Sequence, residues 1–211
     1  MHLTIFGATG RTGTCLVKQA LAAGDSVTAV VRDPSRLSVP RRPGLDVVTA
    51  DVTDPADIVP AIDEADAVVS TVGASTSGPT SITADSAASI VEAMEKTGCQ
   101  RLVVVSGSIA DDTGAGFVMR HALEPLARAM FLKHVCADMR RAESRVHASS
   151  LDWTIVRPPR LTNKAATGRY RSAAGHNLAH GYSISRADLA AFLLSVVRDP
   201  STIHQDLFVA R

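Results

Sequence analysis

Seven residues near the start of the chain, Gly7-Ala8-Thr9-Gly10-Arg11-Thr12-Gly13, stand directly behind the apolar run Leu3–Phe6. Glycines at this spacing let a chain leave a strand sharply, bring its backbone close to a ligand and enter a helix that packs tightly on a sheet. The free N–H groups and positive dipole end of such a helix attract an anion. We therefore predict that the pyrophosphate of a dinucleotide is held by Gly7, Thr9, Gly10, Arg11, Thr12 and Gly13.

The end of the second predicted strand bears on which dinucleotide binds. An acidic residue there binds the ribose hydroxyls of NAD, whereas a nearby arginine accommodates the 2′-phosphate of NADP. Here the strand ends in Val31-Arg32-Asp33, and Arg36 follows one helical turn later. Because a guanidinium binds a phosphate by paired hydrogen bonds, Arg32 and Arg36 favour NADP(H). Asp33 keeps a ribose contact open if Arg32 points away.

Residues behind the third and fourth predicted strands extend this groove. Asp51 and Val52 stand where the adenine ring is expected, and Asp51 either accepts a hydrogen bond from its amino group or caps the next helix. Asp54 precedes Pro55 and is interpreted as a helix N-cap. The nicotinamide ribose is expected to lie against the backbone of Thr71, Val72 and Gly73.

Two hydroxyl groups follow the fifth predicted strand, at Ser106 and Ser108. Ligands of open α/β sheets bind at the carboxyl ends of the strands. Either serine is therefore a candidate catalytic residue, and Ser106 also a cofactor contact, through a hydrogen bond to the nicotinamide carboxamide or to a substrate. The alternative is a loop serine that caps the following turn.

The elements that must position these residues are visible as apolar runs that alternate with helical stretches. Predicted strands cover residues 3–6, 26–31, 46–49, 67–71, 102–105, 153–156 and 207–209. Predicted helices cover 12–23, 82–96, 115–149 with a break near Pro125, and 186–198. Nearly continuous Val/Ile runs between helices are typical of a parallel sheet covered on both faces. We predict an α/β protein with a Rossmann-type doubly wound parallel sheet, a single domain in which residues 157–185 form a small substrate-binding segment.

Composition excludes several classes of function. A net charge of +1 argues against a nucleic-acid partner, and no apolar run is long enough to span a membrane. The chain opens on a strand without a secretory signal, so we expect a cytoplasmic protein. Three separated cysteines predict reduced, buried packing residues. His176 and His180 are bracketed by glycines and predict a loop, and no metal site is expected. The cysteines are Cys15, Cys99 and Cys136.

Several segments together resemble the atypical short-chain dehydrogenase/reductases, and among these the NmrA-like NAD(P)H-binding proteins and the biliverdin-IXβ/flavin reductases. The resemblance implies NADPH binding and reduction of a small-molecule acceptor, either a flavin (FMN or FAD) or a linear tetrapyrrole. It also places Pro158 in the pocket wall beside the nicotinamide. We expect a monomer or homodimer. The segments are residues 7–13, 31–33, 51–52, 105–108, 152–159, 167–170 and 184–190.

The chain departs from this family in its acid–base residues. Short-chain dehydrogenases carry a Tyr-x-x-x-Lys pair after the fifth strand, but the tyrosines here are Tyr170 and Tyr182, and neither has a lysine four positions on. Flavin-reductase relatives carry a Ser/Thr pair where Gly107 takes one place. Hydride transfer to a conjugated ring system still requires only orientation and proximity. A protein that senses NADP without turnover, of the NmrA kind, is the alternative. Further candidate proton donors are Asp111, Asp112 and His121. Glu143 on the long predicted helix is a candidate for a place near the one left by the missing lysine pair.

Overall fold

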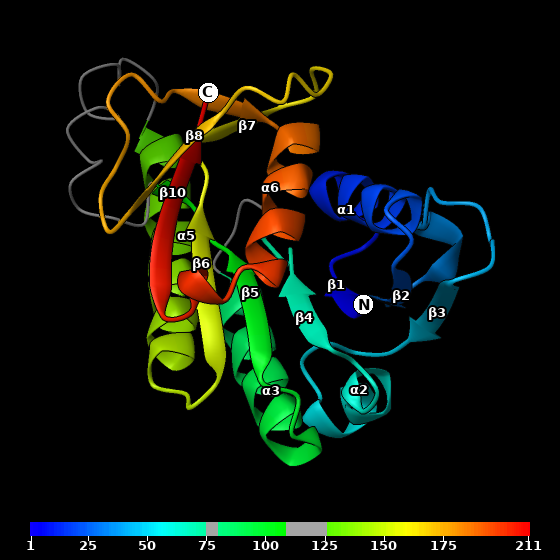
Figure 1. Cartoon of the computed structure of the whole chain (residues 1–211). Coiled ribbons are helices and arrows are strands. Elements are labelled where there is room, and N and C mark those ends of the chain that lie inside the picture. The colour runs from blue at the N-terminus through cyan, green and yellow to red at the C-terminus, as the bar shows by residue number, and fades with distance from the viewer. Residues whose placement is uncertain (75–79, 109–125) are drawn as a thin grey trace.

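The computed structural model describes residues 1–74, 80–108 and 126–211, with the side chains of α5 described from residue 134 onward. An eight-stranded sheet runs through it in the order β3-β2-β1-β4-β5-β6-β10-β8 (Figure 1). The strand order reverses between β1 and β4, the switch point at which doubly wound sheets bind their ligands. The strands are β1 (His2–Phe6), β2 (Ser26–Val31), β3 (Leu45–Thr49), β4 (Ala67–Ser70), β5 (Arg101–Val105), β6 (Asp152–Arg157), β8 (Arg171–Ala174) and β10 (Gln205–Ala210).

Helices cover both faces of this sheet, as the continuous apolar strands predict. On one face α1 (Arg11–Ala22) packs beside α6 (Arg186–Arg198), and on the other lie α2 (Pro55–Ile62), α3 (Ile82–Thr97) and α5 (Leu126–His147). Successive strand residues alternate between the two cores: Ile5 joins the core under α1 and α6, and Phe6 the core under α2 and α3. The predicted Rossmann-type fold is therefore confirmed.

Most predicted boundaries agree with the structure to within one or two residues. Strand β2 and helix α6 have the predicted ends, and β4 ends at Ser70, one residue early. Glycines in the left-handed region follow two helices, with φ of +86° at Gly24 and +78° at Gly98. These positions favour glycine because a side chain there clashes with the backbone. No helix in the described part of the chain is long and apolar enough to cross a membrane.

The C-terminal third departs from the prediction. The segment 157–185, in which no separate strand was predicted, contains β8 and β9 (Ser183–Ser185), and β9 pairs in parallel with β7 (Arg160–Thr162). Strand β8 runs antiparallel to β10, so the large sheet is not purely parallel. These strands are three or four residues long and rich in polar residues, so they show no apolar alternation that sequence reasoning can detect.

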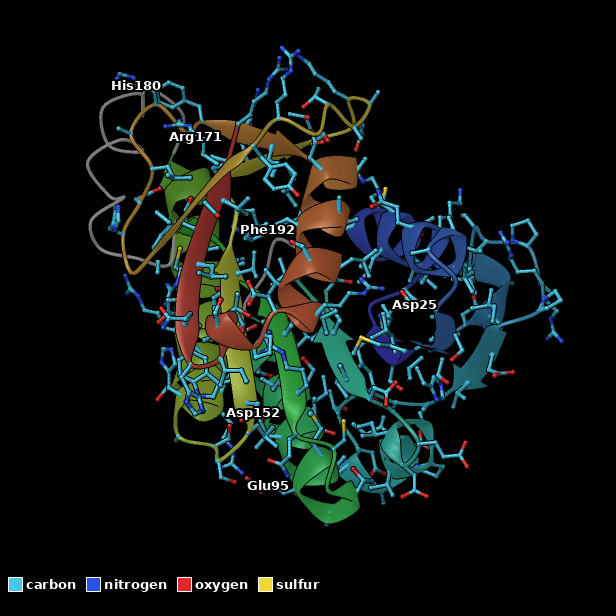
Figure 2. The ribbon with its side chains drawn as sticks, viewed as in Figure 1. Asp25, Glu95, Asp152, Arg171, His180 and Phe192 are labelled. Carbon is cyan, nitrogen blue, oxygen red and sulfur yellow. The ribbon has the colours of Figure 1, made fainter. Side chains whose placement is uncertain are left out.

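A buried carboxylate ties this segment to the sheet. Asp188, in the first turn of α6, accepts hydrogen bonds from the backbone N–H groups of Thr167 (2.8 Å) and Gly168 (2.9 Å) and from the Ser185 hydroxyl (2.8 Å). Nearby, the ring of Tyr170 meets Phe192 edge-on, with 5.6 Å between centroids. Figure 2 shows Arg171 and His180 at the opposite end of the molecule from Asp152 and Glu95. The polar segment therefore lies over the carboxyl ends of the strands.

Candidate cofactor-binding site

The glycine loop leaves β1 in one tight turn. Gly7 has a φ of +76°, and its carbonyl oxygen accepts a hydrogen bond of 2.9 Å from the N–H of Gly10. A Cβ added at Gly7 would lie 2.8 Å from the carbonyl carbon of Thr71, so the loop after β4 passes directly against this turn. The Thr71 N–H and hydroxyl both donate to the Phe6 carbonyl, at 3.0 Å each. The ends of β1 and β4 are thus locked together beside the loop.

The N-terminus of α1 has no internal partner for its first N–H groups. Gly10 is the N-cap and offers no side chain, and the first turn holds no acidic residue. Gly10 and Arg11 are exposed, whereas Thr9 and Thr12 are half-buried. Unsatisfied N–H groups at a positive dipole end form a site for an anion. The loop therefore fits the pyrophosphate of a dinucleotide, with an additional positive charge from Arg11.

The residues after β2 present two arginines to solvent. Arg32 and Arg36 are exposed, and neither forms an ion pair within the described ranges. Asp33 instead caps the short 3₁₀ helix η1 (Pro34–Arg36), where its Oδ1 accepts from the Ser35 hydroxyl (2.6 Å) and N–H (3.0 Å). These bonds lower the pKa of Asp33. The carboxylate has a local structural partner, and the guanidinium groups are left for an anion.

Asp51 also makes local bonds. Its Oδ1 accepts from the N–H (2.9 Å) and hydroxyl (2.8 Å) of Thr53, which lower its pKa, and the charge of Arg32 adds to this effect. Asp54 caps α2 through the N–H of Ala56 at 2.9 Å, as predicted. Because Asp54 and not Asp51 caps α2, the capping role predicted for Asp51 is wrong. The contact with the adenine amino group stays a prediction, and Oδ2 of Asp51 forms no bond in the described residues. Val52 beside it is half-buried.

The ends of β4 and β5 present contrasting surfaces. Val72 is half-buried, and Gly73 is exposed with open space where a Cβ would stand. A side chain at position 73 would therefore not clash with the rest of the described protein. Ser106 and Ser108 are both buried, and their backbone N–H groups donate to Val156 (2.8 Å) and Pro158 (3.0 Å). The serines thus continue the pairing of β5 with β6, and Pro158 forms the adjacent edge.

A comparison with protein-family models identifies the family to which a chain with this site belongs. The model described as NAD(P)H-binding matches residues 7–200. The chain belongs to the NAD(P)H-binding family. The matched region begins at the first glycine of the loop and ends just beyond α6, so it includes every predicted ligand contact.

Known proteins similar to this NAD(P)H-binding chain span several organisms. An uncharacterised chloroplastic protein of Arabidopsis thaliana is 32% identical over 89% of the chain and 68% of its own length. ChuY of Escherichia coli O157:H7, an anaerobilin reductase, is 26% identical, with a TM-score of 0.81 over 100% of this chain and 97% of its own. A Veillonella parvula short-chain dehydrogenase/reductase in complex with NADP shares the fold, at 18% identity and a TM-score of 0.76 over 100% and 94%.

Sequence reasoning underestimated one polar cluster in this NAD(P)H-binding protein. Arg157 at the end of β6 is buried, and its guanidinium contacts Glu143 on α5 (3.1 Å) and Asp206 on β10 (3.0 Å). His147, one helical turn after Glu143, reaches the other oxygen of Asp206 at 3.2 Å. The i, i+4 spacing of Glu143 and His147 was the available signal, but their partner on β10 is 59 residues farther along the chain than His147.

Other candidates lie elsewhere. Tyr170 packs against Phe192, and Tyr182 is exposed, so neither contributes to the ends of β4 and β5. Arg141 pairs with Asp138, which in turn caps α3 by accepting from the Thr83 N–H at 3.0 Å. Three candidate proton donors lie outside the described residues: Asp111, Asp112 and His121.

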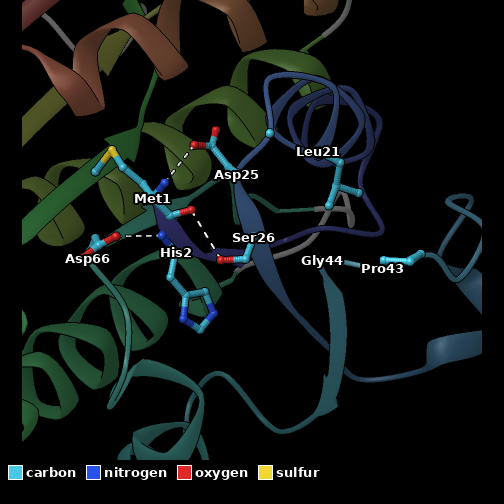
Figure 3. Close-up of a pocket in the computed structure, with 9 residues that line it drawn as sticks. Met1, His2, Leu21, Asp25, Ser26, Pro43, Gly44 and Asp66 are labelled. Carbon is cyan, nitrogen blue, oxygen red and sulfur yellow. Dashed lines mark hydrogen bonds and ion pairs between the residues drawn. The ribbon is translucent and has the colours of Figure 1, made fainter.

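A pocket of about 570 Å³ opens at the amino ends of the strands, beside the start of β1 and β2 (Figure 3). It is lined by His2, Asp25 and Asp66 among others. Asp25 pairs with the Met1 ammonium group and with Arg198, and Asp66 accepts from the His2 N–H at 2.7 Å. Its acidic groups are therefore already occupied, and the pocket is far from the glycine loop.

Proposed function

We propose that this protein is an NADPH-dependent reductase that transfers a hydride to a planar conjugated acceptor, such as a flavin or a linear tetrapyrrole. The observation that carries the proposal is the uncapped N-terminus of α1 behind the glycine loop, with exposed Arg32 at the end of the neighbouring strand. A dinucleotide bound there presents its nicotinamide near the ends of β4 and β5. The nicotinamide supplies the hydride.

The preference for NADPH rests on charge. Arg32 and Arg36 form no ion pair in the described residues and act on Asp51 and Asp33 only through their charge, whereas Asp33 is hydrogen-bonded by Ser35. A 2′-phosphate placed between the two guanidinium groups receives charge-assisted hydrogen bonds that a 2′-hydroxyl cannot match. Asp51 then lies beside the adenine side of the groove, close enough to Arg32 for its pKa to respond to that charge.

The choice of acceptor rests on the positions of the two tyrosines, which lie away from the ends of β4 and β5, and on the similarity to a known reductase. Neither tyrosine is placed to protonate a ketone, as described above. Hydride transfer to an electron-poor ring system depends chiefly on orientation. The proposal has the acceptor ring stack on the nicotinamide beside Pro158 and the β7–β9 pair. The similar protein ChuY, whose fold covers this whole chain, is described as an anaerobilin reductase, which supports the choice of a reductase.

The test is NADPH oxidation, followed by absorbance, with FMN, FAD, riboflavin and biliverdin offered separately. Cofactor affinity is titrated on the same sample. We expect NADPH to bind more tightly than NADH and at least one acceptor to be reduced. Gly10→Val is the matched control, because a side chain at this exposed N-cap enters the pyrophosphate space. Tight NADPH binding without turnover of any acceptor would reject the reductase in favour of an NADP-sensing regulator.

A further inference from the structure

Two buried oxygen atoms at the carboxyl end of β5 have no aligned hydrogen-bond partner in the described residues. They are Oγ of Ser106 and Oε1 of Glu143, from side chains in residues that are only 9% and 6% exposed. A buried polar group without a partner costs free energy, commonly about 1–3 kcal/mol. Such pairs are therefore retained where a function uses them.

Glu143 shares its cationic partner Arg157 with a second carboxylate, that of Asp206. Its Oε1 lies 3.1 Å from Arg157, but that guanidinium donates two hydrogen bonds to Asp206, from Nη2 at 3.0 Å and Nε at 3.3 Å. One buried guanidinium thus faces two carboxyl groups. His147, on the far side of Asp206, is more than a third exposed and adds charge only when protonated.

The groups that face Glu143 come from every described element packed against it. They are Ser106 after β5, Arg157 on β6, Asp206 on β10, and Cys136 and His147 on α5 itself. Burial raises the pKa of Glu143, and the carboxylate of Asp206 raises it further. The adjacent Ser106 hydroxyl, although not aligned for a hydrogen bond, and the charges of Arg157 and His147 lower the pKa of Glu143 without cancelling this rise.

We propose that Glu143 is a positioning residue and proton reservoir for Ser106, and that the Ser106 hydroxyl delivers the proton that completes reduction of the acceptor. This inference rests on the proposed function. Hydride leaves the nicotinamide of NADPH and forms a new bond on the acceptor, which yields NADP⁺. The O–H bond of Ser106 breaks as its proton reaches the reduced acceptor. Glu143 returns a proton to Ser106 in the same step and becomes a carboxylate, which takes a proton from solvent between turnovers.

This arrangement supplies what the missing Tyr-x-x-x-Lys pair would provide. Ser106 follows β5, where its N–H donates to the Val156 carbonyl of β6, and Glu143 on α5 contacts the next residue of β6, Arg157. Arg157 stabilises the Glu143 carboxylate once the proton has left. Because Arg157 is shared with Asp206, it does not hold Glu143 permanently ionised.

Glu143→Gln is the direct test, because glutamine keeps the shape of the side chain and cannot release a proton. We expect kcat to fall about 100-fold, the usual contribution of a positioned acid, with NADPH affinity unchanged. In the wild type, kcat should fall as pH rises through the raised pKa of Glu143, and this limb should be absent in the variant. Glu92→Gln, at an exposed ion pair with Lys96 on α3, is the matched control.

Three further measurements separate a proton role from a structural one. Asp206→Asn removes a carboxylate that raises the pKa of Glu143, so the alkaline limb should move to lower pH. Ser106→Ala should lower kcat as Glu143→Gln does. An infrared band of a carboxylic acid that loses its proton above the ordinary pKa of a glutamate should be present in the wild type and absent in Glu143→Gln, whether or not an acceptor is known.

The outcomes distinguish this inference from the proposed function. If wild-type protein binds NADPH and reduces no acceptor, the proposed function fails and the proton step fails with it. If wild-type protein turns over and Glu143→Gln keeps the same kcat and the same pH profile, the reductase stands and Glu143 has no role in proton supply. A limb that does not move in Asp206→Asn would also overturn the inference.

Discussion

A Cβ atom built on Gly13 would lie 2.2 Å from the carbonyl oxygen of Gly7. This contact joins the first turn of α1 to the turn that leaves β1, and both partners are backbone. Neither can move aside without opening the loop. The absence of a side chain at Gly13 is therefore a condition for the helix to start where the phosphate-binding N–H groups are needed.

Gly13→Ala should consequently destabilise the protein by about 1–3 kcal/mol, the usual cost of overpacking, and should weaken binding of NADPH. Thermal unfolding and cofactor titration measure the two effects. Gly73→Ala is the matched control for stability, since a Cβ there meets nothing within 4 Å. Unchanged unfolding of Gly13→Ala would show that the loop relaxes more easily than the contact implies.

Arg32→Ala should discriminate between the two cofactors. Loss of a charge-assisted contact to the 2′-phosphate should weaken NADPH binding by about 2 kcal/mol, roughly 30-fold, and leave NADH binding nearly unchanged. Arg42→Ala removes the same charge from another exposed arginine and should have little effect. Equal losses for NADPH and NADH in Arg32→Ala would assign the 2′-phosphate to another residue.

Asp188→Asn should lower the free energy of unfolding and should make that free energy less sensitive to a fall in pH. Burial alone would raise the pKa of Asp188, but the hydrogen bonds from Gly168, Ser185 and Thr167 together lower it from its ordinary 3.8. The stabilisation is therefore complete above pH 3.8 and is lost as pH falls through the lower folded value.

At neutral pH the Asp188→Asn variant should lose about 2 kcal/mol of unfolding free energy. In denaturant titrations at several pH values, its stability should fall less steeply below pH 3.8 than that of the wild type. Asp63→Asn, at an exposed carboxyl after α2, serves as the comparison. A variant with wild-type stability would mean that Thr167 and Gly168 do not depend on this carboxylate.

The cysteines should differ in reactivity. Burial raises the pKa of Cys99 to about 11, so little thiolate is present at mildly alkaline pH. Cys15 is half-buried and more accessible. Alkylation followed by mass spectrometry should modify Cys15 first and leave Cys99 intact until the protein is unfolded. Equal rates for the two thiols in folded protein would contradict the burial of Cys99.

All three cysteines were predicted to be buried. The structure buries Cys99 alone, and Cys15 and Cys136 are half-buried.

The sequence was sufficient wherever one strong local pattern controls the structure. The glycine loop, the Val/Ile strands and the Asp54-Pro55 cap all appear as predicted, because each depends on neighbours a few residues away. Strands β7, β8 and β9 escaped prediction because their pairing comes from distant partners and each is only three or four residues long.

The polar cluster behind Ser106 escaped full prediction for the same reason. Glu143 drew attention for its place on the long helix, but its environment is set by Arg157 and Asp206, which reach it only after β6 and β10 pair. Burial and shared charge are properties of that assembly. Spacing along α5 can indicate which side chains share a face and cannot show what covers them.

The carboxylate of Asp188 has a consequence for how such proteins diversify. It fixes Thr167–Gly168 at one end of the segment above the sheet and Ser185 at the other. Lengthening a loop whose ends are already fixed costs little additional entropy. Mutations and insertions between these anchors can therefore accumulate while the glycine loop stays intact, so a lineage can exchange one acceptor for another and inherit its nucleotide groove unchanged.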